Sequence, residues 1–302
     1  MRPEATILYR MRCEMYKVVT KRFLNDAKTI CLFEIEAPFI ARHARAGQFV
    51  IFRLDEQGER VPVSVAGYDR QKGTVTVMVQ AAGRTTKMLH TVEQGDYISD
   101  IAGPLGKATE MEGLKKVCVV GGGVGCAIAY PIAKEMHERG IEVTFIAGFR
   151  SADIVILKDE LKEVSDKLII CTDDGSYGRK GFTTLFLKQE IEANIAWSQP
   201  QFDRVIAIGP DIMMKFLADV TRPYGISTII SLDPIMVDGT GMCGCCRVIV
   251  GGETKFACVD GPDFDAHLVD FDSLIKRAAF YKEEQDEADK HICRMTGGKR
   301  NG

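Results

Sequence analysis

The chain has 302 residues, of which 46% are hydrophobic and 27% are charged, so it is long enough for two or three domains and can bury a large core. Its formal net charge is −3, from 39 basic and 42 acidic residues, which excludes a general electrostatic nucleic-acid binder with a basic face. No apolar run reaches the ~18 residues of a membrane span, and the N-terminus lacks the apolar core of a signal peptide. We therefore expect a cytoplasmic protein that binds neither nucleic acid nor membrane.

The first third of the chain predicts short antiparallel strands. Several runs alternate apolar and polar side chains with a period of two, and their spacing is typical of a small β-barrel or sandwich. The expected strands cover residues 15–23, 28–37, 47–54, 60–68, 73–80 and 95–103, with one short helix over 85–90.

From Lys115 to Ile230, apolar strand patterns alternate with helical patterns. The expected strands are 115–122, 141–149, 167–175, 203–210 and 225–231, and the expected helices are 127–140, 154–166, 183–194 and 211–225. This alternation predicts a parallel sheet covered by helices. An irregular, glycine-rich segment and a final helix over 271–291 follow. We place domains at 15–110, 111–230 and 231–270, with a C-terminal helix and tail over 271–302.

Ten cysteines in a chain without an export signal do not indicate a disulfide framework, and six of them are scattered as small buried apolar residues would be. The other four, Cys243, Cys245, Cys246 and Cys258, fall within 16 residues. A plant-type [2Fe–2S] loop has the spacing C-x4-C-x2-C with a distant fourth cysteine. Here Asp238 stands at the first position, followed by Cys243, Cys246 and the distant Cys258. Nearby glycines permit the tight turns that such a loop needs.

Two other readings of this loop stay open. Its cysteines are incidental in one of them. In the other, zinc is held by Cys243, by either Cys245 or Cys246, and by Cys258, although only one C-x2-C pair is present. Cys245 is an alternative to Asp238 as the fourth ligand, but we favour a non-ligand because its backbone direction alternates from that of its neighbours.

A glycine-rich turn, Gly121–Gly125, joins a predicted strand to a predicted helix. Glycines let the backbone approach a pyrophosphate, and the helix N-terminus offers unpaired N–H groups. The sequence shows no clear acid at the position that usually binds an NAD ribose, and Arg150 is a candidate contact there. A tight turn without a ligand is the alternative.

Two features of the β-rich part suggest a second phosphate site. Arg60 precedes Pro62, Val63 and Ser64 at a predicted strand, and Gly83 opens a short helix with Thr85 and Thr86. An arginine beside such a helix start can hold a pyrophosphate, whereas an ordinary surface charge is the alternative for Arg60.

Taken in order, these features resemble the ferredoxin reductase-like superfamily, in its branch with a C-terminal [2Fe–2S] domain. Within it, the chain is similar to the small subunits of NADH-dependent reduced ferredoxin:NADP oxidoreductases, also described as sulfide dehydrogenase subunits. The similar segments span roughly residues 15–282 and include MYKVV, AGQFVIFR, TDDGSYGRKGF, AIGPDIMM, DGTGMCG and FACVDGPDFDAHLVDFD. Residues 1–14 precede the family's usual start, which makes Met15 a candidate initiator.

The resemblance implies three cofactors: FAD on the barrel, NAD(H) on the α/β domain with NADP(H) left open, and a [2Fe–2S] cluster in the C-terminal domain. Its implied FAD contacts are Arg60, Pro62, Val63, Ser64, Gly83, Thr85 and Thr86. Its implied nucleotide contacts are Gly122, Gly123 and Gly125, to which the position of Arg150 in the sequence adds a further candidate. Its implied cluster ligands are Asp238, Cys243, Cys246 and Cys258. Val63 departs from the tyrosine that is usual at that position, and the proline that often follows the glycines stands only at Pro131.

The resemblance also implies a partner, a larger flavoprotein subunit with iron–sulfur clusters, and through that complex ferredoxin, in an electron-bifurcating enzyme. An electron-transfer subunit of dihydroorotate dehydrogenase is the main alternative, although that subunit normally has four cysteine ligands. A zinc-binding scaffold subunit without redox activity is another. His267 is a candidate catalytic base, but we favour a structural histidine in a turn.

Overall fold

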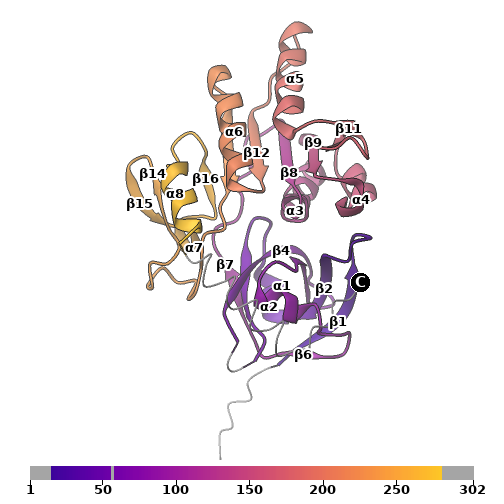
Figure 1. The fold of residues 1–302 in the computed structure, drawn as a ribbon, viewed down its shortest axis with the longest axis vertical. Coiled ribbons are helices and arrows are strands. Elements are labelled where there is room, and N and C mark those ends of the chain that lie inside the picture. The colour runs from indigo at the N-terminus through magenta and orange to yellow at the C-terminus, as the bar shows by residue number, and fades with distance from the viewer. Residues whose placement is uncertain (1–14, 56–57, 281–302) are drawn as a thin grey trace, which may run out of the picture.

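The structure is a computed structural model that describes residues 15–55 and 58–280. Figure 1 shows a barrel at the bottom, a helix-covered sheet above it, and the C-terminal segment beside both. The multi-domain fold predicted from the sequence is therefore confirmed. Within the described residues no helix combines the length and apolar character that crossing a membrane requires.

The barrel is a seven-stranded antiparallel sheet with the order β6-β1-β2-β5-β4-β3-β7. Its strands are β1 (Tyr16–Phe23), β2 (Ile30–Glu36), β3 (Phe49–Arg53), β4 (Val61–Asp69), β5 (Thr74–Gln80), β6 (Tyr97–Ile98) and β7 (Asp100–Leu105). The alternation along β2 buries Phe33 and Ile35, which pack with Val65 and Val77 inside the barrel. The predicted short helix is α2 (Arg84–Leu89), and α1 (Pro38–His43) was not predicted.

The second sheet has the order β11-β10-β9-β8-β12-β13-β16. Its strands are β8 (Lys116–Gly122), β9 (Glu142–Phe149), β10 (Lys167–Thr172), β11 (Arg179–Lys180), β12 (Arg204–Ile208), β13 (Ser227–Ser231) and β16 (Asp263–Asp265). All its pairs are parallel except β13 with β16. The covering helices are α3 (Gly125–Glu138), α4 (Lys158–Glu163), α5 (Thr183–Ala196) and α6 (Asp211–Thr221), with short 3₁₀ turns at Ala152–Ile154 and Arg222–Tyr224.

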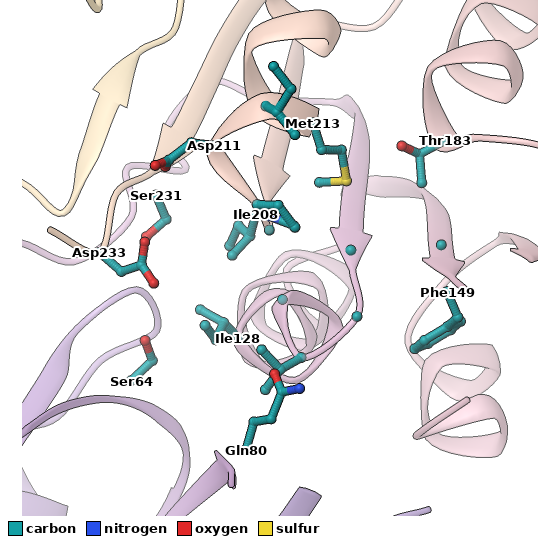
Figure 2. A pocket seen from close by; sticks show the side chains of 18 of the residues that line it. Ser64, Gln80, Ile128, Phe149, Thr183, Ile208, Asp211, Met213, Ser231 and Asp233 are labelled. Atoms are coloured by element: carbon teal, nitrogen blue, oxygen red, sulfur yellow. The ribbon is translucent and has the colours of Figure 1, made fainter. Parts of the chain in front are cut away.

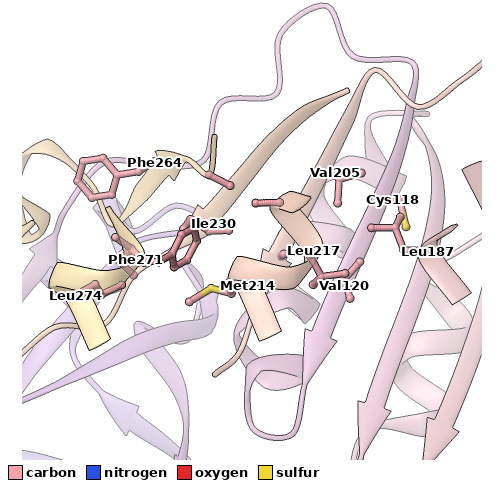
Figure 3. Packing of buried hydrophobic residues seen from close by; sticks show 14 of the residues in the cluster. Cys118, Val120, Leu187, Val205, Met214, Leu217, Ile230, Phe264, Phe271 and Leu274 are labelled. Carbon is pink, nitrogen blue, oxygen red and sulfur yellow. The ribbon is translucent and has the colours of Figure 1, made fainter. Parts of the chain in front are cut away.

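The C-terminal segment is packed onto this sheet. It contains the hairpin β14 (Arg247–Val250) and β15 (Glu253–Phe256), then α7 (Ala257–Asp260), β16 and α8 (Phe271–Ala278). Figure 3 shows Phe264, Phe271 and Leu274 beside Ile230 and Met214 in one continuous core. Burial of each such side chain stabilises the contact by about 1.5–3 kcal/mol. The loop between β13 and β14 is therefore held in a fixed place relative to the sheet.

The remaining predictions about cysteines and the C-terminus are partly covered by the structure. The scattered cysteines Cys31, Cys118, Cys126 and Cys171 are free and buried, as predicted. The end of the predicted last helix beyond residue 280, the tail, residues 1–14, Cys13 and Cys293 lie outside the described residues.

Candidate functional site

A cavity of about 1010 Å³ lies between the barrel and the parallel sheet. It is bordered by the carboxyl ends of β8, β12 and β13, where the strand order changes direction between β8 and β12. Open parallel sheets bind ligands at such a switch point. Figure 2 shows Ser64 of the barrel across from Asp233 and Ile208 of the sheet domain. Seven of the predicted site residues line this cavity: Pro62, Val63, Ser64, Gly122, Gly123, Gly125 and Arg150.

The glycine turn after β8 is shaped by close packing. A Cβ atom on Gly125 would lie 2.2 Å from the carbonyl oxygen of Ile208, and one on Gly122 would lie 2.5 Å from Sδ of Met213. Gly123 has a left-handed backbone with φ of 56°, and its N–H donates to the Gly148 carbonyl at 2.8 Å. The turn therefore brings the N-terminus of α3 to the cavity wall, where its N–H groups and positive dipole end suit a phosphate.

Asp173, directly after β10, is an acid on the cavity wall that the sequence patterns did not single out. It lines the cavity together with Arg150, which follows β9. The Asp173 N–H donates to the Phe149 carbonyl at 3.0 Å, so the two strand ends are joined at this point. Its position after the apolar run of β10 is the signal that could have identified it. This end of the cavity offers one carboxylate and one guanidinium to a ribose or phosphate.

Arg60 joins the barrel to the cysteine loop. Its Nε donates to the Val237 carbonyl at 2.7 Å, and its Nη1 lies 3.7 Å from Oδ2 of Asp100. Arg60 does not line the large cavity. Arg60, which directly precedes β4, therefore contacts the residue before Asp238. The same strand β4 carries Ser64.

The residues at the start of α2 lie at a separate, smaller cavity of about 370 Å³, which Thr85 lines with Arg84. Thr85 donates from its hydroxyl to Oε2 of Glu59 at 2.5 Å. The Thr86 hydroxyl accepts from the N–H of Gly83 at 3.0 Å and so stabilises the first turn of α2. Of the flavin residues predicted from the sequence, Pro62, Val63 and Ser64 thus line the large cavity and Thr85 lines the smaller one, whereas Arg60, Gly83 and Thr86 line neither of the two.

The loop before β14 brings the four predicted cluster ligands together in two pairs. The Cys243 thiol lies 3.2 Å from Oδ1 of Asp238, and the thiols of Cys246 and Cys258 lie 3.2 Å apart. A [2Fe–2S] cluster takes two protein ligands at each iron. In the described residues, no three His, Cys, Asp or Glu side chains converge on one point, as a single zinc ion requires. The donor set therefore fits a two-iron cluster.

Charge and burial differ between the two pairs. Cys246 and Cys258 are buried, and burial raises the pKa of Cys258 to about 12. The half-buried Asp238 accepts from the Thr240 hydroxyl and from the thiol and N–H of Cys243, and these hydrogen bonds hold its pKa well below the usual range. An ionised carboxylate is the form that binds metal.

The loop is also fixed to the barrel. A Cβ atom on Gly239, whose φ is 78°, would lie 2.8 Å from Cδ1 of Ile51 and 2.7 Å from Cδ1 of Leu105. Glycine at this position allows the loop backbone to lie directly on the β3 and β7 side chains. The loop that carries Asp238 and the segment Arg60–Ser64 are thus both held on the barrel.

Two further candidates lie away from the cavity. His267 has its Nε2 3.0 Å from the Thr221 hydroxyl at the end of α6, in keeping with a structural histidine. Cys245 is partly exposed, and its carbonyl accepts from Arg277 at 3.0 Å. A hydrogen bond with Cys243 raises the pKa of the Cys245 thiol.

Comparison with known proteins agrees with this geometry. Residues 233–270 match the iron–sulfur cluster binding domain of dihydroorotate dehydrogenase B. An uncharacterized protein of Clostridium beijerinckii is 47% identical over 285 residues, 92% of this chain and 94% of that protein. A homolog of the dihydroorotate dehydrogenase B (NAD(+)) electron transfer subunit from Thermotoga maritima is 44% identical over 271 residues, 90% of this chain and 94% of that protein.

A solved structure of NADH-dependent reduced ferredoxin-NADP oxidoreductase, studied for flavin-based electron bifurcation, contains a chain that is 43% identical to this one. The alignment covers 92% of this chain and 98% of that chain, with a TM-score of 0.83. The chain therefore belongs to the family of electron transfer subunits of the dihydroorotate dehydrogenase B and reduced ferredoxin-NADP oxidoreductase type, within the ferredoxin reductase-like superfamily.

Proposed function

We propose that this chain is an iron–sulfur flavoprotein subunit that passes electrons between NAD(H), FAD and a [2Fe–2S] cluster. The cluster then exchanges electrons with a larger flavin and iron–sulfur subunit, in an electron-bifurcating ferredoxin:NADP oxidoreductase. The specific activity proposed is that of a flavin-dependent NAD(P)H:ferredoxin-type oxidoreductase subunit. The similar chain in the solved oxidoreductase structure supports this assignment over the other readings of the sequence.

The observation that carries the proposal is the shared support of three sites. Ser64 of β4 and Gly125 of α3 line one cavity. Arg60, four residues before Ser64, holds the carbonyl of Val237 beside the cluster loop. A hydride donor, a flavin and a one-electron centre need such proximity, because each transfer requires contact or a short path.

The roles of individual residues follow from their positions. The N–H groups at the start of α3 would bind the dinucleotide pyrophosphate, with Gly122, Gly123 and Gly125 allowing its close approach. Pro62, Val63 and Ser64 would face the flavin ring, while Gly83, Thr85 and Thr86 would support its phosphate end with Arg60. Arg150 and Asp173 would contact the adenosine part. Asp238, Cys243, Cys246 and Cys258 would hold the cluster.

A bound flavin would supply the chemistry that links a two-electron hydride donor to a one-electron centre. The chain itself needs no acid–base residue for this transfer. It has to orient the two rings in the cavity and hold the cluster loop against the barrel.

Dihydroorotate dehydrogenase electron transfer is the second candidate. The match of residues 233–270 to the corresponding cluster domain and the Thermotoga maritima homolog favour it. Asp238 counts against it, because that subunit normally carries four cysteine ligands. Electron delivery from dihydroorotate by the purified native complex would favour this candidate, whereas delivery between NADH, NADPH and ferredoxin favours the main proposal.

An anaerobic titration of the purified protein with NADH, and separately with NADPH, tests the proposal. We expect NADH to bleach both the flavin and the cluster absorbance. Bleaching by NADPH alone would overturn the NAD(H) assignment, and a colourless protein would overturn the redox function. A matched pair of variants tests the ligands, since Cys246→Ser should lose the cluster absorbance and Cys245→Ser in the same loop should keep it.

A further inference from the structure

Polar side chains gather along one side of the large cavity, and apolar side chains lie next to them. Figure 2 shows Ser64, Asp233, Ser231 and Asp211 along one side. The carboxyl-bearing residues come from the start of α6 and from the segment that follows β13. Apolar side chains that face the same space are Ile128, Ile208 and Met213. Apart from Ser64, the residues of this polar side have no role assigned above.

Asp211 and Asp233 lack a compensating cation. Within residues 15–55 and 58–280, neither carboxyl group forms an ion pair, and Asp233 accepts a hydrogen bond from its own backbone N–H. The Asp233 side chain reaches solvent, and it lines the cavity. Partial desolvation in the cavity wall, and then the nearby Asp211, raises the pKa of Asp233 above its ordinary value, and the contact of this side chain with solvent limits the shift. Burial also raises the pKa of Asp211, although the positive end of α6 favours its charged form. At pH 8 this wall carries uncompensated negative charge.

The cation that could offset this charge lies elsewhere. Among the described residues that line the cavity, the ionisable side chains are Arg150, Asp173, Asp211 and Asp233. Arg150 follows Phe149, which Figure 2 shows on the far side of the cavity from Asp233. A phosphate or carboxylate is therefore disfavoured beside Asp233, whereas a neutral group with N–H donors is favoured.

The orientation of a bound dinucleotide indicates which neutral group with N–H donors would lie beside Asp233. If the pyrophosphate lies at Gly122–Gly125 and the adenosine near Arg150, the nicotinamide ring reaches the side of the cavity where Ser64 and Asp233 face each other. A nicotinamide ring carries a carboxamide, whose NH₂ group donates two hydrogen bonds. Nicotinic acid has a carboxylate at the same place and donates none.

We propose that Asp233, with Asp211 behind it, recognises the carboxamide of the nicotinamide ring and excludes a carboxylate at that position. This inference rests on the proposed function, because it assumes that the cavity binds a nicotinamide dinucleotide. Asp233 is a positioning and specificity residue in this account. It accepts the amide N–H and fixes the ring that must face the flavin.

The test compares the binding of NAD⁺ and nicotinic acid adenine dinucleotide to the oxidised, cofactor-loaded protein by calorimetry at pH 8. No turnover occurs, so the readout is affinity. We expect the wild type to bind NAD⁺ at least about tenfold more tightly, because two like charges face each other in the analogue complex. Asp233→Asn should lose most of this discrimination, mainly by binding the analogue better. Asp219→Asn, the same change on an exposed part of α6, should leave it unchanged.

Each other outcome counts against the inference in a distinct way. Equal affinity of the wild type for both dinucleotides overturns it and leaves the proposed function intact. An equal loss of both affinities in Asp233→Asn would show a structural role only. Failure of the wild type to bind either dinucleotide overturns the nucleotide function of the cavity as well. If Asp233→Asn does not fold, Asp211→Asn should still lose part of the discrimination, and unchanged discrimination there would also refute the inference.

Discussion

Gly125 gives a prediction whose size can be worked out from the structure. In Gly125→Ala the new Cβ would lie 2.2 Å from the Ile208 carbonyl oxygen, 2.7 Å from its carbon and 2.9 Å from Cα of Gly209. These are backbone atoms of β12 and its end, so no side-chain rotation relieves the clash. The start of α3 must move by about 1 Å to reach an ordinary contact, and such overpacking costs about 1–3 kcal/mol. The higher helix propensity of alanine offsets at most about 1 kcal/mol.

The same shift moves the N–H groups of α3 away from the cavity, so Gly125→Ala should lose both stability and NAD⁺ affinity. Urea unfolding and calorimetry measure the two effects. Gly140→Ala is the matched control, because Gly140 follows the other end of α3 with φ of 78° and nothing within 4 Å of its Cβ position. It should lose about 1–2 kcal/mol of stability from backbone strain and no affinity. Wild-type stability and affinity in Gly125→Ala would refute the packing argument.

Two further substitutions test the electrostatics and the cluster. Burial raises the pKa of Asp263 from 3.8 to about 6, so the native state holds a proton that the unfolded state releases, and stability falls as pH rises from about 4 to about 7. In urea unfolding, Asp263→Asn should remove up to about 3 kcal/mol of this change in the unfolding free energy with pH. An unchanged pH dependence in the variant would contradict the raised pKa of Asp263. Asp238→Cys should keep a cluster but shift its reduction potential and EPR signal, because thiolate is a softer donor than carboxylate. An unchanged potential and spectrum would show that Asp238 is not a ligand.

The barrel and the sheet could be predicted because their patterns are local. Period-two alternation along β2 and β5 and apolar runs ending in glycine, as in β8, identify strands without knowledge of their neighbours. The helix α1 was missed, although Pro38 at its first position is a recognised start signal. The predicted helix over 154–166 is α-helical only over Lys158–Glu163. The apolar residues directly before it form an extended segment, and Leu157 adopts a left-handed conformation.

The site was predictable only where a motif carries it along the chain. The glycine turn and the cysteine loop have fixed spacings, so their residues could be named from the sequence. Asp173, Asp211 and Asp233 have no such spacing. They line one cavity because β10, β12 and β13 end at one edge of the sheet, and each comes shortly after an apolar strand. The contact of Arg60 with Val237 joins residues 177 positions apart, which no local pattern encodes.

The central claim is that electrons from NADH reach the cluster through the flavin held by the same chain. The direct measurement is low-temperature EPR of the purified protein after anaerobic addition of NADH, with and without prior removal of FAD. The account predicts a reduced-cluster signal in the flavin-loaded protein, none in the flavin-depleted protein, and its return when FAD is restored. A cluster that NADH reduces equally well without flavin, or never reduces in the loaded protein, would contradict the account.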